Sequence, residues 1–93
     1  PQRDRVMSDD AIPEINPIFR LQWEEAQNSF VLLYPEGMVK LSQSAGEILK
    51  RINGESSVQD IIRDLQSVFP GVDLSSDVMT FINQATENGW LNR

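Results

Sequence analysis

The sequence contains no cysteine and no histidine. Without these residues the chain has no disulfide bond, no thiolate nucleophile, no imidazole general base and none of the commonest zinc ligands. We therefore expect no catalytic residue, no bound metal and no cofactor. The missing cysteines also fit a reducing compartment, which makes the cytoplasm the expected location.

Long apolar runs and an excess of positive charge are missing as well. No stretch approaches the roughly 20 apolar residues that cross a bilayer, and no segment resembles a signal peptide. Fourteen acidic residues against eight basic ones give a net charge of −6. This charge repels phosphate backbones and anionic membrane surfaces, so we expect neither nucleic acid nor a membrane as a partner.

What is present suffices for one small domain. The 93 residues are 40% hydrophobic and 24% charged, a composition typical of globular proteins. Residues 1–17 are polar, contain three prolines and follow neither the helical nor the strand period. They predict a flexible N-terminal tail, ordered only if Ile12 and Ile15 find a groove. The folded domain is expected over residues 18–93.

The most informative stretch is residues 30–41, in which two apolar runs of strand length flank the turn Pro35, Glu36, Gly37. This pattern is typical of a hairpin. Residues 18–24 alternate apolar and polar side chains, which indicates a half-buried strand. We therefore predict a three-stranded antiparallel meander over residues 18–24, 30–34 and 38–41, with the apolar strand in the middle.

Two helices are expected next along the chain. The first begins at Ser42 or Ser44, where Ser44 and Glu47 fit a capping box, and ends at residues 53–54. The second begins with a capping box of Ser57 and Asp60 and ends at residues 70–71. Its apolar stripe consists of Val58, Ile61, Ile62, Leu65 and Phe69.

A third helix is expected from Ser75 or Ser76 to Asn88, and Trp90 and Leu91 should then fold back onto the core. Three strands followed by three helices predict an α+β fold in which helices cover one face of the sheet, a winged-helix-like arrangement.

A winged-helix layout raises the alternatives of a nucleic-acid-binding module or a general protein-interaction module. The expected third helix has no Lys or Arg and carries Asp77 and Glu87, whereas a DNA reader concentrates positive charge there. Carboxylate pairs such as Asp60 and Asp64 lie on solvated faces, where capping and solubility explain them. The chain also lacks a phosphate-binding loop and a nucleophile motif, so we do not expect an enzyme.

The third strand offers another kind of binding group. If residues 38–41 lie at the edge of the sheet, their unpaired backbone groups could accept an extended peptide as an additional strand. On the pattern alone, the simpler interpretation is a short edge protected by Lys40. Both interpretations remain open at this point.

The sequence resembles the D-protein family of pyrroloquinoline quinone biosynthesis over about residues 15–91. The specific part is the run Leu-Leu-Tyr-Pro-Glu-Gly-Met-Val-Lys-Leu at residues 32–41, preceded by Arg-Leu-Gln-Trp at residues 20–23. The similarity continues through Ser44, Ala45, Ile48, Leu49, Asn53, Gly54, Asp77, Val78, Gly89, Trp90 and Leu91.

This resemblance implies a peptide chaperone, the stand-alone form of the recognition element used for ribosomally made, modified peptides. The implied partners are the small precursor peptide of the quinone cofactor and a radical S-adenosylmethionine enzyme, to which the chaperone presents that peptide. Catalysis would belong to the enzyme. The chaperone is expected as a monomer or a weak dimer, with strand or tail exchange between copies as one form of the dimer.

In related recognition elements the peptide adds beside the third strand and lies against the third helix. Carried onto this sequence, the resemblance implies that the peptide-binding residues are Met38, Val39, Lys40, Leu41, Asp77, Val78, Phe81, Ile82 and Ala85.

Overall fold

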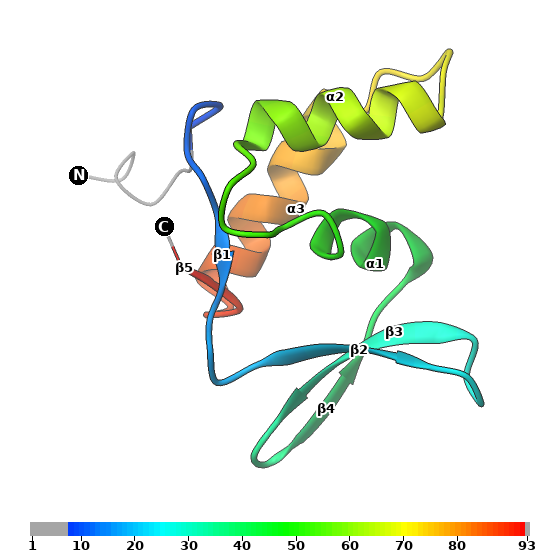
Figure 1. The fold of residues 1–93 in the computed structure, drawn as a ribbon, viewed down its shortest axis with the longest axis vertical. Helices are drawn as coiled ribbons and strands as arrows, with labels where there is room; N and C mark the ends of the chain where they lie inside the picture. Colours follow the sequence, from blue (N-terminus) through cyan, green and yellow to red (C-terminus); the bar gives the residue numbers. More distant parts are fainter. Residues whose placement is uncertain (1–7, 93) are drawn as a thin grey trace.

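The computed structural model describes residues 8–92. In Figure 1 the helices gather at one end and a sheet of three strands lies at the other. The predicted α+β fold, with three antiparallel strands followed by three helices, is confirmed. The elements are β1 (Glu14–Ile15), β2 (Arg20–Glu24), β3 (Ser29–Tyr34), β4 (Gly37–Lys40), α1 (Gln43–Leu49), α2 (Val58–Val68), α3 (Ser75–Glu87) and β5 (Leu91–Asn92).

Strands β2, β3 and β4 form an antiparallel meander with β3 in the middle, as predicted. Asn28 adopts a left-handed φ of 53° in the turn between β2 and β3, a conformation that Asn tolerates better than most residues. Val31 and Leu32 of β3 have no exposed surface. The apolar run therefore forms the covered centre of the sheet.

Helix α1 begins where one of the two expected caps lies but is shorter than predicted. The side chain of Ser42 accepts a hydrogen bond from the backbone N–H of Ala45, so the expected box of Ser44 and Glu47 is not the cap. The helix ends at Leu49 rather than at residues 53–54. Beyond Leu49 the backbone forms tighter turns, with Ile52 N–H bonded to Leu49 O at 3.1 Å, which still bring Ile52 into the core.

Helix α2 begins as the sequence predicts. The Ser57 hydroxyl accepts from the N–H of Asp60, and the Asp60 carboxylate accepts from the N–H of Ser57, each at 3.1 Å. This reciprocal capping box satisfies two backbone donors at the helix start. Phe69 does not complete the buried stripe, because it lies at the end of the helix with φ −122° and remains 42% exposed.

Helix α3 and the residues after it close the core. Gly89 follows the helix with a positive φ of 82°, and the N–H of Trp90 bonds to the carbonyl of Ala85 at 2.9 Å. This left-handed ending turns the chain back toward the core. Leu91 is 3% exposed, and Trp90 packs against the core with its ring 6.5 Å from that of Phe81. The predicted return of Trp90 and Leu91 is confirmed.

A second, two-stranded sheet was not predicted from the sequence. Strand β1 pairs antiparallel with β5, so that Ile15 lies opposite Leu91. Nearby, the N–H of Val58 bonds to the carbonyl of Ala11 at 2.9 Å, and the Pro13 side chain is fully buried. These contacts attach residues 8–15 to the helical end. Residues 1–7 of the expected tail lie outside the described residues, and the division at residue 17 stays a prediction.

All three helices and the sheet share one hydrophobic core. The buried side chains come from β3, from the residue after β4, from the inner faces of the helices, from the turn after α1 and from β5. They are Leu32, Leu41, Ala45, Ile48, Leu49, Ile52, Val58, Ile61, Leu65, Val78, Ile82, Ala85 and Leu91.

Candidate functional site

Strand β4 is an open edge of the sheet. Among the described residues it has a neighbouring strand, β3, on one side only. The N–H of Leu41 donates to the carbonyl of Phe30 at 3.1 Å, and pairing continues in register along β4. Because hydrogen-bonded pairs alternate along an antiparallel ladder, Val39 also directs its backbone groups to β3. The N–H and C=O groups of Met38 and Lys40 therefore point toward the open side.

The two faces of β4 differ in burial. Leu41, directly after the strand, is 4% exposed, and Val39 packs against the core from the same face. Met38 and Lys40 lie on the opposite face, where Met38 is 47% exposed and Lys40 is also exposed. One face thus anchors the strand, while its edge and its other face stay accessible.

A groove with a volume of about 630 Å³ adjoins the end of this edge. It lies among the start of α1, the end of α2 and the first half of α3. The chain leaves β4 at Lys40 and reaches the groove wall at Ser42, so the end of β4 lies near the groove. The lining residues are Ser42, Gln43, Ser44, Glu47, Ile48, Leu65, Phe69, Leu74, Asp77, Val78 and Phe81.

The structure brings some of the expected third-helix residues to this groove and not others. Asp77, Val78 and Phe81 line it. Asp77 is exposed and Phe81 half-buried, whereas Val78 is only 2% exposed. Ile82 and Ala85 have no exposed surface and pack inside the core. The groove therefore presents Asp77 and Phe81 to a ligand. Ile82 and Ala85 instead pack α3 against the core.

Sequence reasoning missed much of the apolar wall of the groove, including Ile48, Phe69 and Leu74. Ile48 belongs to an ordinary helical stripe, and the sequence pattern places Phe69 in the apolar stripe of α2. A helical period shows that a residue faces a neighbour, but it does not distinguish a packed interface from an open groove. Phe69 is 42% exposed and lines the groove, so it faces an open groove and not a packed interface.

The loop between α2 and α3, which carries Leu74 into the groove wall, is held by one side chain. The Gln66 amide donates to the carbonyl of Val72 and accepts from the N–H of Leu74, both at 2.6 Å. A Gln side chain can donate and accept at the same time. Gln66 therefore closes the loop and fixes this part of the wall.

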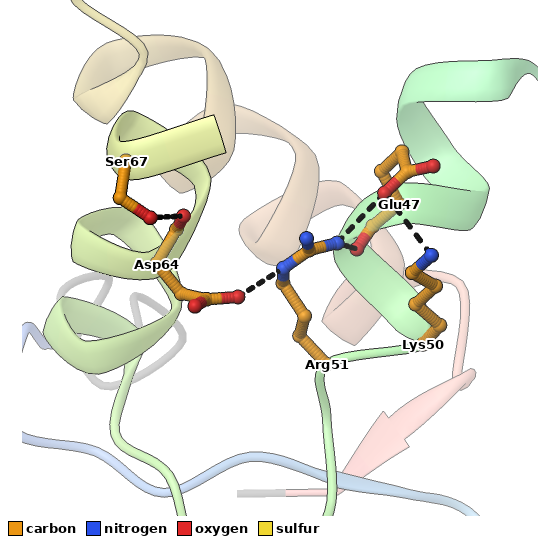
Figure 2. A network of polar contacts seen from close by, with 5 residues as sticks. All are labelled: Glu47, Lys50, Arg51, Asp64 and Ser67. Carbon is orange, nitrogen blue, oxygen red and sulfur yellow. Dashed lines mark hydrogen bonds and ion pairs between the residues drawn. The ribbon is translucent and has the colours of Figure 1, made fainter. Parts of the chain in front are cut away.

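A polar network joins the end of α1 to α2, as Figure 2 shows. The Arg51 guanidinium donates to the Glu47 carboxylate and to the Glu47 carbonyl, each at 2.8 Å, and to the Asp64 carboxylate of α2. Lys50 lies 3.5 Å from the same Glu47 carboxylate oxygen. The hydrogen bond from Arg51, aided by Lys50, holds the pKa of Glu47 below its ordinary value. Arg51 thus links α1 to α2 through Glu47, which also lines the groove.

Residues 8–92 contain no cluster of three or more acidic, Cys or His side chains placed to hold a metal ion. None of their helices is long and apolar enough to cross a membrane. What the edge and the groove can offer is backbone hydrogen bonding beside an apolar surface.

The profile of the family described as "Coenzyme PQQ synthesis protein D (PqqD)" matches residues 29–91. The chain belongs to this family. The match contains β3, β4, the three helices and Leu91, and it confirms the resemblance seen in the sequence.

Two relatives carry the name "PqqA binding protein". That of Acinetobacter baylyi is 46% identical over 80 residues, which cover 85% of this chain and 81% of the relative. That of Azotobacter vinelandii is 47% identical over 81 residues, which cover 86% of this chain and 88% of the relative. These relatives are therefore similar to this chain over most of their length.

A solved structure supports the fold. The solution NMR structure of the PqqD truncation of Methylobacterium extorquens PqqCD, described as a stand-alone ribosomally synthesized and post-translational modified peptide recognition element, superposes with a TM-score of 0.80. The superposition covers 98% of this chain and 99% of that one at 24% identity. At this identity the likeness shows the fold.

Proposed function

We propose that this chain binds the precursor peptide of pyrroloquinoline quinone biosynthesis by strand addition at β4. The observation that carries the proposal is the open edge of β4, where Met38 and Lys40 direct their backbone groups outward next to an apolar groove. An extended peptide would continue the ladder and place side chains into the groove. Membership of the PqqD family, with relatives named PqqA binding protein, supports the choice of peptide.

The proposed contacts follow from the faces of β4 and α3. The peptide backbone bonds to Met38 and Lys40, and peptide side chains on the helical face enter the groove against Phe69 and Phe81. Asp77 lies at the rim, where it favours a basic or hydrogen-bond-donating group of the peptide. Val39 and Leu41 hold the edge in place from beneath.

The chain acts in this proposal as a cytoplasmic chaperone and not as an enzyme. It presents the bound peptide to a radical S-adenosylmethionine enzyme, which carries out the chemistry. An edge that binds through its backbone suits this role, because it holds the peptide extended without requiring a reactive side chain.

The test is a titration of isotope-labelled protein with synthetic precursor peptide, followed by NMR. We expect saturable shifts of the amides of residues 38–41 and of the first half of α3. Met38→Pro removes an outward N–H without touching the ladder to β3, so it should weaken binding while the thermal unfolding midpoint changes little. Saturation without shifts in either element would overturn the proposed site.

A second measurement tests whether this chain modifies the peptide by itself or only presents it to an enzyme. The protein and peptide are incubated without any other enzyme, and the peptide mass is then determined. We expect no change in mass. A modified peptide under these conditions would contradict the proposed role as a chaperone.

A further inference from the structure

Within residues 8–92, strand β2 is the second open edge of the same sheet, and the proposed function does not use it. Since Phe30 directs its backbone groups to β4, the next residue, Val31, directs its groups to β2, where Gln22 lies opposite. Gln22 therefore bonds inward. The N–H and C=O groups of its neighbours, Leu21 and Trp23, point away from the sheet.

The residues of β2 read Arg20, Leu21, Gln22, Trp23, Glu24, and this order is self-complementary. If two copies of β2 pair antiparallel about a two-fold axis at Gln22, then Arg20 of each copy lies opposite Glu24 of the other. Leu21 of each copy lies opposite Trp23. Cross-strand pairs of opposite charge and of apolar side chains both stabilise a sheet.

The backbone geometry agrees with this register. Leu21 and Trp23 both have outward groups, so placing them opposite each other forms the closely hydrogen-bonded pairs of an antiparallel ladder. A shift by one residue would place an outward residue opposite an inward one and break the ladder. The register that pairs the charges is thus also one that the backbone permits.

The side chains at this edge are available for such a contact. Trp23 is 44% exposed although it is an aromatic residue, with its ring 5.1 Å from that of Phe30. Arg20 is exposed, and among the described residues it makes no ion pair. The Glu24 carboxylate accepts from the amide of Gln22 at 2.7 Å, which orients it on the same face as Arg20. Aromatic and Arg side chains are the groups enriched at protein interfaces.

We propose that the chain forms a two-fold symmetric dimer through β2, with a second copy of itself as the partner. The two sheets join into one continuous sheet with β4 at both outer ends. Both β4 edges stay open, so each copy keeps its own proposed peptide site. The overlap is only five residues long, and such small interfaces are weak and concentration-dependent.

A charge exchange tests this pairing by analytical ultracentrifugation. The weight-average mass of the wild-type protein should rise toward that of a dimer between about 10 μM and 1 mM, as expected for weak association. Arg20→Glu places Glu opposite Glu24, and Glu24→Arg places Arg opposite Arg20, so each variant alone should dimerise about tenfold more weakly. An equimolar mixture of the two variants has opposite charges at both pairs and should recover association, which also shows that both variants fold.

A cross-link tests the position of the axis. The chain has no cysteine, so Gln22→Cys introduces a single thiol that would lie about 4.5 Å, Cα to Cα, from its copy across the axis, within the range for a disulfide. Mild oxidation should convert this variant to a covalent dimer much faster than Met38→Cys, the control at the other open edge. A monomeric wild-type protein at every concentration, a mixture that fails to associate better than its components, or equal cross-linking of the two Cys variants would each overturn the proposal.

Discussion

Gly46 of α1 lies directly against the ring of Phe30 in β3, so that a Cβ at residue 46 would be only 2.9 Å from the Cδ2 atom of Phe30. Real Cβ atoms do not approach this closely, and the glycine therefore allows α1 to contact the sheet. This contact determines how closely α1 packs against β3.

We expect Gly46→Ala to destabilise the protein. Overpacking of a core contact costs about 1 to 3 kcal/mol, whereas the better helix propensity of Ala returns at most about 1 kcal/mol. The net loss should be visible as a lower urea midpoint. In a Phe30→Ala background the ring atoms at 2.9 and 3.5 Å are gone and only the Cβ of residue 30, at 3.3 Å, remains close, so the same Gly46→Ala change should cost much less than in the wild-type protein. Equal losses in both backgrounds would show that the contact with Phe30 is not the cause.

Removing Arg51 should loosen the attachment of α1 to α2. Its side chain is 15% exposed and reaches both Glu47 and Asp64, so Arg51→Ala should lower the free energy of unfolding by about 1 to 2 kcal/mol. Arg51→Lys should recover only part of this loss, because an ammonium group lacks the planar fork that reaches both partners.

The matched control for Arg51 is Arg63, which pairs with Asp60 on the surface and is 68% exposed. Exposed ion pairs contribute little, so Arg63→Ala should change the free energy of unfolding by less than about 0.5 kcal/mol. Similar losses for the two alanine variants would contradict a bracing role for Arg51.

Glu47 should make stability depend on pH. Because the hydrogen bond from Arg51 holds the pKa of Glu47 below its ordinary value of 4.5, the unfolded chain takes up this proton first as the pH falls. The contribution of Glu47 is therefore fully present above the ordinary pKa and is lost as the pH falls through the lower, folded-state value. Glu47→Gln should flatten this part of the profile, measured as urea midpoints across the acidic range, and an unchanged acidic limb would refute the assignment.

Substituting two neighbouring exposed apolar residues should affect peptide binding differently. Phe69 lines the groove and Val68 does not, although they are 42% and 51% exposed. Phe69→Ala should weaken binding of the precursor peptide about tenfold, the effect expected of an aromatic anchor, whereas Val68→Ala should leave the dissociation constant unchanged. Isothermal titration calorimetry measures both. Equal changes of the dissociation constant in the two variants would contradict a contact between Phe69 and the peptide. The peptide would then bind elsewhere, or the weaker binding would reflect lower stability alone.

Local chemistry made several elements predictable from sequence. The box of Ser57 and Asp60 joins residues three apart, and the left-handed turn at Gly89 depends on one residue. The hairpin of β3 and β4 is likewise encoded within residues 30–41. Such features need no knowledge of the rest of the fold.

The parts that could not be predicted depend on residues distant in the chain. The pairing of Ile15 with Leu91 joins strands of two residues each, too short for a recognisable period. Helix α1 ends early at Leu49, and Asn53, expected in its cap, instead accepts hydrogen bonds from the N–H groups of Glu55 and Ser56. The groove arises from the angles between three helices, which periodicity does not determine.

The pairing of β1 with β5 has a practical consequence for attaching a probe. It places Glu14 opposite Asn92, so these two residues, far apart in the sequence, lie side by side at the helical end in Figure 1 and away from β4. A fluorophore attached at residue 14 or at residue 92 would therefore report from the same corner of the fold and leave the β4 edge unobstructed.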